Sequence, residues 1–140
     1  MLQEKIIEIK SKTVNNFGEE DVMEIKTVGK YGIKNGKTYL CYDEGGALGV
    51  DGVTTILKVQ DDFVVLTRTG SLDSRLEIEK GERHQCHYST VYGDLFLGIF
   101  GEDLKNNLKE DGGKLYMSYT LDVNCEFMSR NDIEITVKEV

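Results

Sequence analysis

Apolar and polar side chains alternate along most of this chain, in short runs that glycines separate. In the run 5–14, Ile7 and Ile9 fall on one face, while Glu8 and Lys10 fall on the other. A period of two with one charged face is typical of an antiparallel strand that is solvated on one side. The same reasoning predicts about ten strands, which cover residues 5–14, 20–31, 37–43, 53–59, 63–69, 75–80, 84–91, 95–100, 114–123 and 132–140.

The turn signals between these runs favour a closed sheet. Asn35-Gly36 is a strong hairpin dipeptide, and short strands with regular turns indicate an all-β sandwich or barrel. Closing the sheet removes the exposed edges that a chain made only of strands has to protect. We therefore predict one domain, 1–140, folded as an antiparallel up-and-down β-barrel of about eight to ten strands, filled by side chains or holding one small ligand. A two-sheet sandwich is the alternative.

The segment 102–110 is compatible with two structures. Leu104 and Leu108 are four residues apart, which suits a short helix. The neighbouring residues also allow a bent continuation of the preceding strand. The pattern alone leaves both structures open.

The hairpin formed by the fourth and fifth predicted strands places an arginine on an apolar face. With a two-residue turn at Asp61-Asp62, Thr55 lies opposite Arg68. Side chains alternate along a strand, so Arg68 shares one face with Leu66 in any register. We therefore predict that Arg68 points to the interior, close to one mouth of the barrel.

A guanidinium in that position needs a partner, because burying an unpaired charge is costly. One interpretation is a structural ion pair with a nearby carboxylate such as Glu44, or contacts with carbonyl oxygens. The other is an anion clamp for a ligand carboxylate or phosphate, to which the planar guanidinium offers a bidentate fork.

Charge and composition narrow the choice of partners. The chain has 17 Lys and Arg against 25 Asp and Glu, a net charge of −8, which argues against nucleic acid or an anionic membrane because phosphate binding needs clustered positive charge. There is neither a transmembrane run nor a secretory signal pattern. The three cysteines, Cys41, Cys86 and Cys125, are odd in number and widely spaced. We therefore expect reduced thiols in the cytoplasm rather than disulfides; the oligomeric state is left open.

Other candidate chemistry is weaker. His84, Cys86 and His87 lack the spacing of a zinc site, and the adjacent Cys86 and His87 point to opposite faces of a strand, so they cannot pair directly as a nucleophile and base. We expect no metal and no cofactor. Tyr88 and Thr90 share one face of their strand, where they could line a pocket or pack against neighbouring strands.

An ordered set of short motifs resembles the YwiB-like bacterial proteins of unknown function. The motifs are Tyr42-Asp43-Glu44, Arg68-Thr69-Gly70, Tyr88-Ser89-Thr90-Val91-Tyr92-Gly93, Gly113-Lys114-Leu115-Tyr116, Tyr119-Thr120-Leu121 and Asn131-Asp132-Ile133. The segment 71–80 departs from the Met- and Phe-bearing strand of that family. The resemblance implies a calycin-like, lipocalin-type barrel with no defining activity or ligand, and a backbone role for Gly70 and Gly93. Calycins as a group bind small, often apolar molecules, which is an argument from fold alone.

The leading hypothesis is a cytosolic barrel that binds a small molecule. Its ligand would be anionic and amphipathic, with the head group on Arg68 and the body among aromatic side chains. The residues that we expect to line the site are Glu44, Arg68, Tyr88, Thr90 and Tyr119. The second hypothesis is a non-catalytic interaction or structural module with a filled barrel, whose acidic surface would favour a basic protein partner. The third is an enzyme, which would need a His or a carboxylate inside the barrel beside an open cavity.

Overall fold

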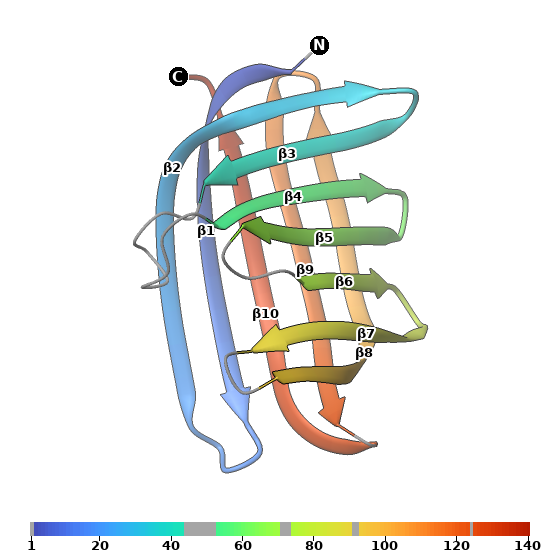
Figure 1. Cartoon of the computed structure of the whole chain (residues 1–140). Helices are drawn as coiled ribbons and strands as arrows, with labels where there is room; N and C mark the ends of the chain where they lie inside the picture. Colours follow the sequence, from blue (N-terminus) through green and yellow to red (C-terminus); the bar gives the residue numbers. More distant parts are fainter. Residues whose placement is uncertain (1, 44–52, 71–73, 91–92, 124) are drawn as a thin grey trace.

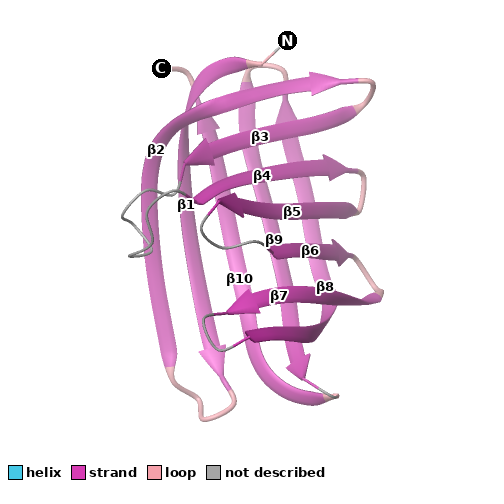
Figure 2. Ribbon diagram, viewed as in Figure 1, coloured by secondary structure: helices cyan, strands magenta, loops and turns pink. Residues whose placement is uncertain are grey.

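Ten β-strands make up most of the described chain. The computed structural model describes every residue except 1, 44–52, 71–73, 91–92 and 124. Figure 2 shows strands joined by turns and loops, with no helix among the described residues. In chain order the strands are β1 (Gln3–Asn15), β2 (Glu20–Lys34), β3 (Lys37–Asp43), β4 (Val53–Gln60), β5 (Phe63–Gly70), β6 (Ser74–Glu79), β7 (Arg83–Thr90), β8 (Gly93–Lys109), β9 (Gly112–Val123) and β10 (Glu126–Lys138). No helix of the described residues is long and apolar enough to cross a membrane.

The strands close into one up-and-down barrel. Each strand pairs antiparallel with the next one in sequence, and β10 pairs with β1 to close the sheet. The predicted barrel is therefore confirmed, and the sandwich alternative is excluded. In Figure 1, β3 to β7 run across the view, whereas β1, β9 and β10 run along it. The barrel thus has two halves whose strands cross steeply, and side chains from both halves meet in its interior.

Two long strands turn the corners between these halves. β2 pairs with β1 as far as Tyr31 and with β3 from Lys30 onward. β8 pairs with β7 in its first half and with β9 from Gly98 onward. A sheet that bends sharply uses bulges or glycines at the bend. Gly29 lies at the corner of β2, and a register shift follows Gly101 at the corner of β8.

The central hairpin has the register that the sequence predicts. β4 and β5 meet at the turn Asp61-Asp62, and Thr55 lies opposite Arg68. Asp61 has a φ angle of 48°, as the first central residue of a tight hairpin turn requires. The alternation of the two strands therefore sets which side chains enter the barrel.

The two motif glycines stand at strand ends with unusual backbone angles. Gly70 ends β5 with a φ of 124°, and Gly93 begins β8 with a φ of 123°. Residues with a Cβ atom rarely adopt this region. The backbone role implied by the resemblance therefore agrees with the structure.

The segment 102–110 continues β8 as a strand. The chain makes a bulge between Gly101 and Asp103 and then alternates again, with Leu104 and Leu108 buried. A spacing of four suits a helix, but it is also even, so both leucines fall on the same face of a strand. The bulge carries that face to the interior.

Candidate functional site

The middle of the barrel is a solid apolar core. Its fully buried aliphatic side chains come from both halves of the barrel: Ile7, Leu40, Leu57, Val59, Val64, Ile78, Ile99 and Leu115. Along β1, the side chains of this face change from Ile7 and Ile9 to Ser11 and Thr13. The interior thus becomes polar towards the end of the barrel at which β1 finishes.

The opposite end, near the start of β1, is closed by its own polar contacts. Tyr31 is 1% exposed and donates a hydrogen bond from its hydroxyl to the carbonyl oxygen of Lys109, at 2.5 Å. Burial, helped by the charge of Asp111, raises the pKa of Tyr31 to about 12, so the hydroxyl keeps its proton. The buried Lys5 ammonium pairs with Glu139 at 2.5 Å. Each of these two buried polar groups therefore has a partner within the chain.

Five neighbouring strands place polar residues side by side at the polar end. Tyr42 lies opposite Thr55, and Thr55 lies opposite Arg68. Arg68 in turn lies opposite Ser74, which lies opposite Tyr88. Cross-strand neighbours have Cβ atoms about 4.5–5.5 Å apart. These five positions therefore form one continuous line across β3 to β7, which we call the polar row.

A small cavity lies beside the polar row. Its volume is about 70 Å³, whereas pockets for drug-sized molecules measure about 300–1,000 Å³. The cavity is lined by Ile9, Ser11, Met23, Ile25, Tyr42, Leu66, Arg68, Met117, Ile133 and Ile135. Arg68 is the charged member of this lining. The cavity has room for a few ordered waters or for a small chemical group.

The Thr55 hydroxyl is the one buried side-chain polar atom of the described residues that has no hydrogen-bond partner. Thr55 is fully buried, and it lies in register between Tyr42 and Arg68, which both line the cavity. An unsatisfied buried hydroxyl costs about 1–3 kcal/mol. An ordered water or a ligand oxygen beside the polar row could satisfy this group.

Replacing Thr55 by valine measures that cost. In the ligand-free protein we expect Thr55→Val to raise the free energy of unfolding by about 1 kcal/mol, because valine keeps the shape and removes the unsatisfied hydroxyl. Urea denaturation gives the value. Thr55→Ser is the control, since it keeps the hydroxyl and loses a buried methyl, and it should lower the free energy by about 1 kcal/mol. A valine variant less stable than the wild type would show that the hydroxyl has a partner.

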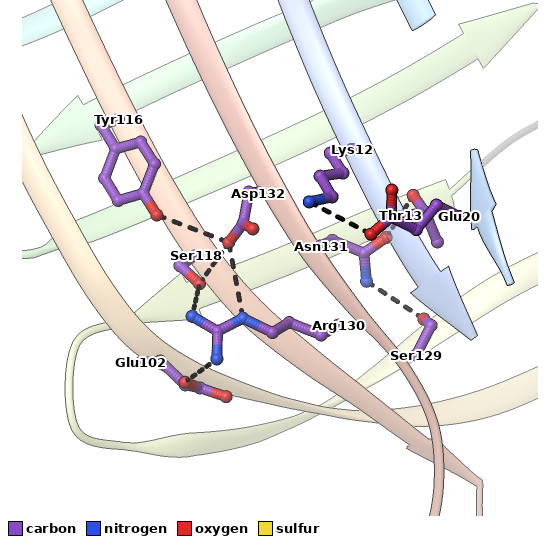
Figure 3. A network of polar contacts seen from close by, with 10 residues as sticks. All are labelled: Lys12, Thr13, Glu20, Glu102, Tyr116, Ser118, Ser129, Arg130, Asn131 and Asp132. Carbon is purple, nitrogen blue, oxygen red and sulfur yellow. Dashed lines mark hydrogen bonds and ion pairs between the residues drawn. The ribbon is translucent and has the colours of Figure 1, made fainter. Parts of the chain in front are cut away.

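Inward residues of β10 continue the polar end on the opposite wall. Thr13 donates a hydrogen bond from Oγ1 to Oδ1 of Asn131 at 2.9 Å, and Asn131 donates from Nδ2 to Oγ of Ser129 at 3.1 Å (Figure 3). Asn131 and Ser129 are buried, and Asn131 lies opposite Tyr119 of β9. This chain of bonds holds the wall in place next to the cavity.

Outward residues of β10 form a separate network. Arg130 contacts Glu102 at 3.2 Å and Asp132 at 3.6 Å, and Ser118 donates a hydrogen bond to Asp132 at 2.6 Å (Figure 3). Because residues alternate along a strand, this network lies on the other side of β10 from Asn131. It joins β8, β9 and β10 at the surface and does not line the cavity.

The structure brings part of the predicted site together. Arg68 is half-buried and lines the cavity, where the hairpin register predicts it. Tyr119 is 6% exposed, two residues along β9 from the cavity-lining Met117. Tyr88 joins the polar row through its backbone pairing, and Thr90 follows it in β7, but their side chains lie outside the described part. Glu44, the partner considered for Arg68, also lies outside the described residues.

Several residues of the site were not among the sequence candidates. Tyr42 and Met23 line the cavity, and Thr55 lies between two lining residues. Alternation puts each of them on the inward face of its strand, so the signal was present in the sequence. Which inward positions of distant strands share one cavity depends on the closure of the barrel.

His84 and Cys86 form no reactive pair. The His84 ring lies between two carboxylates, with Nε2 at 2.8 Å from Glu79 and Nδ1 at 3.4 Å from Glu77, and its edge meets Phe63. The Cys86 sulfur accepts a hydrogen bond from the backbone N–H of Glu77 at 3.2 Å. Burial raises the pKa of the Cys86 thiol. A neutral, buried thiol is a poor nucleophile. In the part of the chain that is described, no group of His, Cys, Asp and Glu could hold a metal ion.

Comparison with known proteins identifies the family. Residues 7–135 match the domain of unknown function DUF1934. The chain belongs to the DUF1934 family. The uncharacterized beta-barrel protein YwiB of Bacillus subtilis (strain 168) is 30% identical to it over 137 residues, which are 97% of this chain and 95% of that protein. The crystal structure of ywiB protein from Bacillus subtilis matches with a TM-score of 0.82 at 26% identity, covering 99% of this chain and 95% of that one.

The expected resemblance to YwiB-like proteins is thereby confirmed, and the barrel is the fold of a DUF1934 relative. Neither the family description nor the name of the relative states a ligand or a reaction. The function of this DUF1934 protein therefore has to be argued from the polar row and its cavity.

Proposed function

We propose that this DUF1934 protein binds a small anionic molecule, whose charged group sits at Arg68 in the cavity beside the polar row. The observation that carries the proposal is the position of Arg68. Arg68 is the charged residue in an otherwise uncharged lining, and in the β4–β5 register it lies opposite Thr55, whose buried hydroxyl has no partner in the described chain. A cationic residue at the cavity, in register with a residue whose hydroxyl is unsatisfied, suits an oxygen-bearing anion.

Arginine is suited to this role even though Arg68 also has an interaction partner within the chain. A guanidinium carries five N–H donors in a planar fork, so it can hold a neighbour and a carboxylate at once. The half-buried site strengthens such a charge-assisted hydrogen bond, because the effective dielectric constant is lower there than in water. A carboxylate or a comparable small anion is therefore the favoured ligand class.

The size of the cavity limits the ligand. About 70 Å³ takes the charged group with a short apolar body, and a longer amphipathic ligand has to displace lining side chains. Met23 and Met117 line the cavity, and methionine is unbranched and adapts readily to irregular spaces. Ligand length is thus a measurable property of the site.

The proposed role is binding without catalysis, in the reducing cytoplasm. No histidine or carboxylate is found among the described residues that line the cavity, and these are the side chains that most often act as general acid or base. The three cysteines are free thiols, which supports a reducing compartment.

The test is native mass spectrometry of the purified chain, followed by extraction of any bound compound. We expect an additional mass from an anionic compound that Arg68→Leu loses. Arg75→Leu is the matched control, because Arg75 lies on the adjacent strand β6 and its side chain is exposed. Circular dichroism shows whether each variant is folded. A wild-type chain that carries no compound, and whose melting temperature no carboxylate of two to eight carbons raises, would contradict the proposal.

A filled barrel that serves protein interaction is the second candidate, and the compactness of the core favours it. The aliphatic residues in the middle of the barrel are fully buried, and the cavity is small. This candidate predicts that Arg68→Leu and Arg75→Leu leave the mass of the native protein unchanged apart from the substitutions themselves. The same mass spectra therefore separate the two functions.

A further inference from the structure

One edge of β2 meets no other strand within the described ranges of the chain. β1 pairs with β2 along one side, but β3 pairs with the other side only from Lys30 onward. In Figure 1, β2 runs down the side of the barrel well past the end of β3. Within residues 20–29, every second residue therefore points its backbone N–H and C=O away from β1, towards the side where no strand is paired. Such an edge is a template for another antiparallel strand.

The sequence of this edge is complementary to itself. When the segment 22–28 is laid antiparallel against a second copy about Ile25, Val22 faces Val28 and Met23 faces Thr27. Glu24 of each copy then faces Lys26 of the other copy, so the two-fold symmetry gives two such pairs of opposite charge. Val22 and Val28 are 63% and 54% exposed in the single chain, so this pairing would cover two large apolar side chains of each copy.

Charge selects this register over its neighbours. Moving the two-fold axis to Glu24 places Glu24 against Glu24, and moving it to Lys26 places Lys26 against Lys26. Like charges directly opposite each other destabilise an antiparallel pair, whereas opposite charges stabilise it. Glu24 makes no ion pair with the described residues, and Lys26 reaches Glu8 only at 3.9 Å. Both side chains are therefore available to a second copy.

We infer that β2 pairs with β2 of a second copy of this chain, antiparallel about Ile25, to form a symmetric dimer. The interface is isologous, as a two-fold axis requires. Its main-chain hydrogen bonds join the two barrels through one continuous sheet. Met23 and Ile25 line the cavity of their own barrel, so the dimer places the walls of the two cavities next to each other. The inference stands on the edge and its charges and does not depend on a ligand.

A charge-swap series in the full chain tests the pairing and its register. Sedimentation equilibrium of the wild type should give twice the 15.8 kDa of one chain. Glu24→Lys and Lys26→Glu each place like charges opposite each other, and each should raise the dimer dissociation constant about tenfold or more. The double variant Glu24→Lys with Lys26→Glu restores opposite charges and should return the constant to near the wild-type value. Glu82→Lys, at an exposed position in the turn between β6 and β7, is the control for a change of charge.

Cysteine cross-linking tests directly which residues of the two β2 strands face each other. In a background with Cys125→Ser, which removes the exposed native thiol, Val22→Cys and Val28→Cys variants are mixed and oxidised. The mixture should give a disulfide-linked dimer, whereas each variant alone should not, because residue 22 faces residue 28. A wild-type chain that remains monomeric at millimolar concentration would overturn the inference. A dimer whose dissociation constant does not change with the charge swaps, and which forms no mixed disulfide, would overturn it as well.

Discussion

We expect Gly29→Ala to lower the free energy of unfolding by about 3 kcal/mol or more, out of the roughly 5–15 kcal/mol that keeps a domain folded. A Cβ atom at residue 29 would lie 2.5 Å from the carbonyl oxygen of Cys41 and 2.6 Å from Cδ1 of Ile7. Favourable non-bonded contacts lie near 3.5–4.0 Å, so something has to move. Ile7 is fully buried and the Cys41 carbonyl belongs to the β2–β3 ladder. The methyl group would therefore force the corner of β2 open.

Gly81→Ala is the control for the corner glycine. Gly81 has a φ of 80° and open space around its Cα atom, so alanine there meets only the backbone penalty of about 1–2 kcal/mol. Urea denaturation followed by far-ultraviolet circular dichroism gives both free energies. If Gly29→Ala cost no more than Gly81→Ala, the tight corner would not be a feature of the barrel in solution.

The second large effect is expected in the apolar core. Leu115→Ala should lower the free energy of unfolding by about 3–5 kcal/mol, because it removes buried methyl groups and leaves a cavity that the barrel wall cannot fill. Leu115 is fully buried on β9, opposite the buried Ile135 of β10. Both strands pair on each side along the barrel, which limits how far the backbone can collapse.

Leu2→Ala makes the same chemical change at a half-exposed position near the N-terminus. It should alter the free energy by at most about 0.5 kcal/mol. Equilibrium unfolding of both variants in urea compares the two leucines directly. A cost for Leu115→Ala as small as that for Leu2→Ala would mean that the middle of the barrel is loosely packed.

The strands, their inward faces and the hairpin register could be predicted from the sequence because they depend on local alternation and turn chemistry. Asp61-Asp62 fixes which residues of β4 and β5 face each other, and Arg68 stands out as a charge among aliphatic neighbours. The segment 102–110 was harder, since Leu104 and Leu108 suit two periods equally well. The bulge after Gly101 puts both leucines on the inward face of a continued strand, and no local pattern in the sequence predicts that bulge.

The polar row and the cavity could not be assembled from the sequence. The row needs four registers at once, from Tyr42 to Tyr88, and each depends on the connection between its strands. The cavity also needs the closure of the barrel, which brings Met23 of β2 and Met117 of β9 to the same space as Arg68. Such contacts between distant parts of the chain come from the packing of the two halves, which alternation does not encode. The self-complementary edge of β2 became visible only when the extent of its pairing with β3 was known.

The most direct test of the anion site follows the four arginine side chains by nuclear magnetic resonance. The chain is labelled with ¹⁵N-arginine and titrated with straight-chain carboxylates from acetate to octanoate. We predict that the Nε–H signal of Arg68 shifts and saturates with one of them. The signals of Arg75, Arg83 and Arg130, which form ion pairs with Glu77, Asp122 and Glu102, should stay in place. An Arg68 signal that stays in place throughout the series, or that moves only in step with the other three, would contradict a carboxylate site inside the barrel.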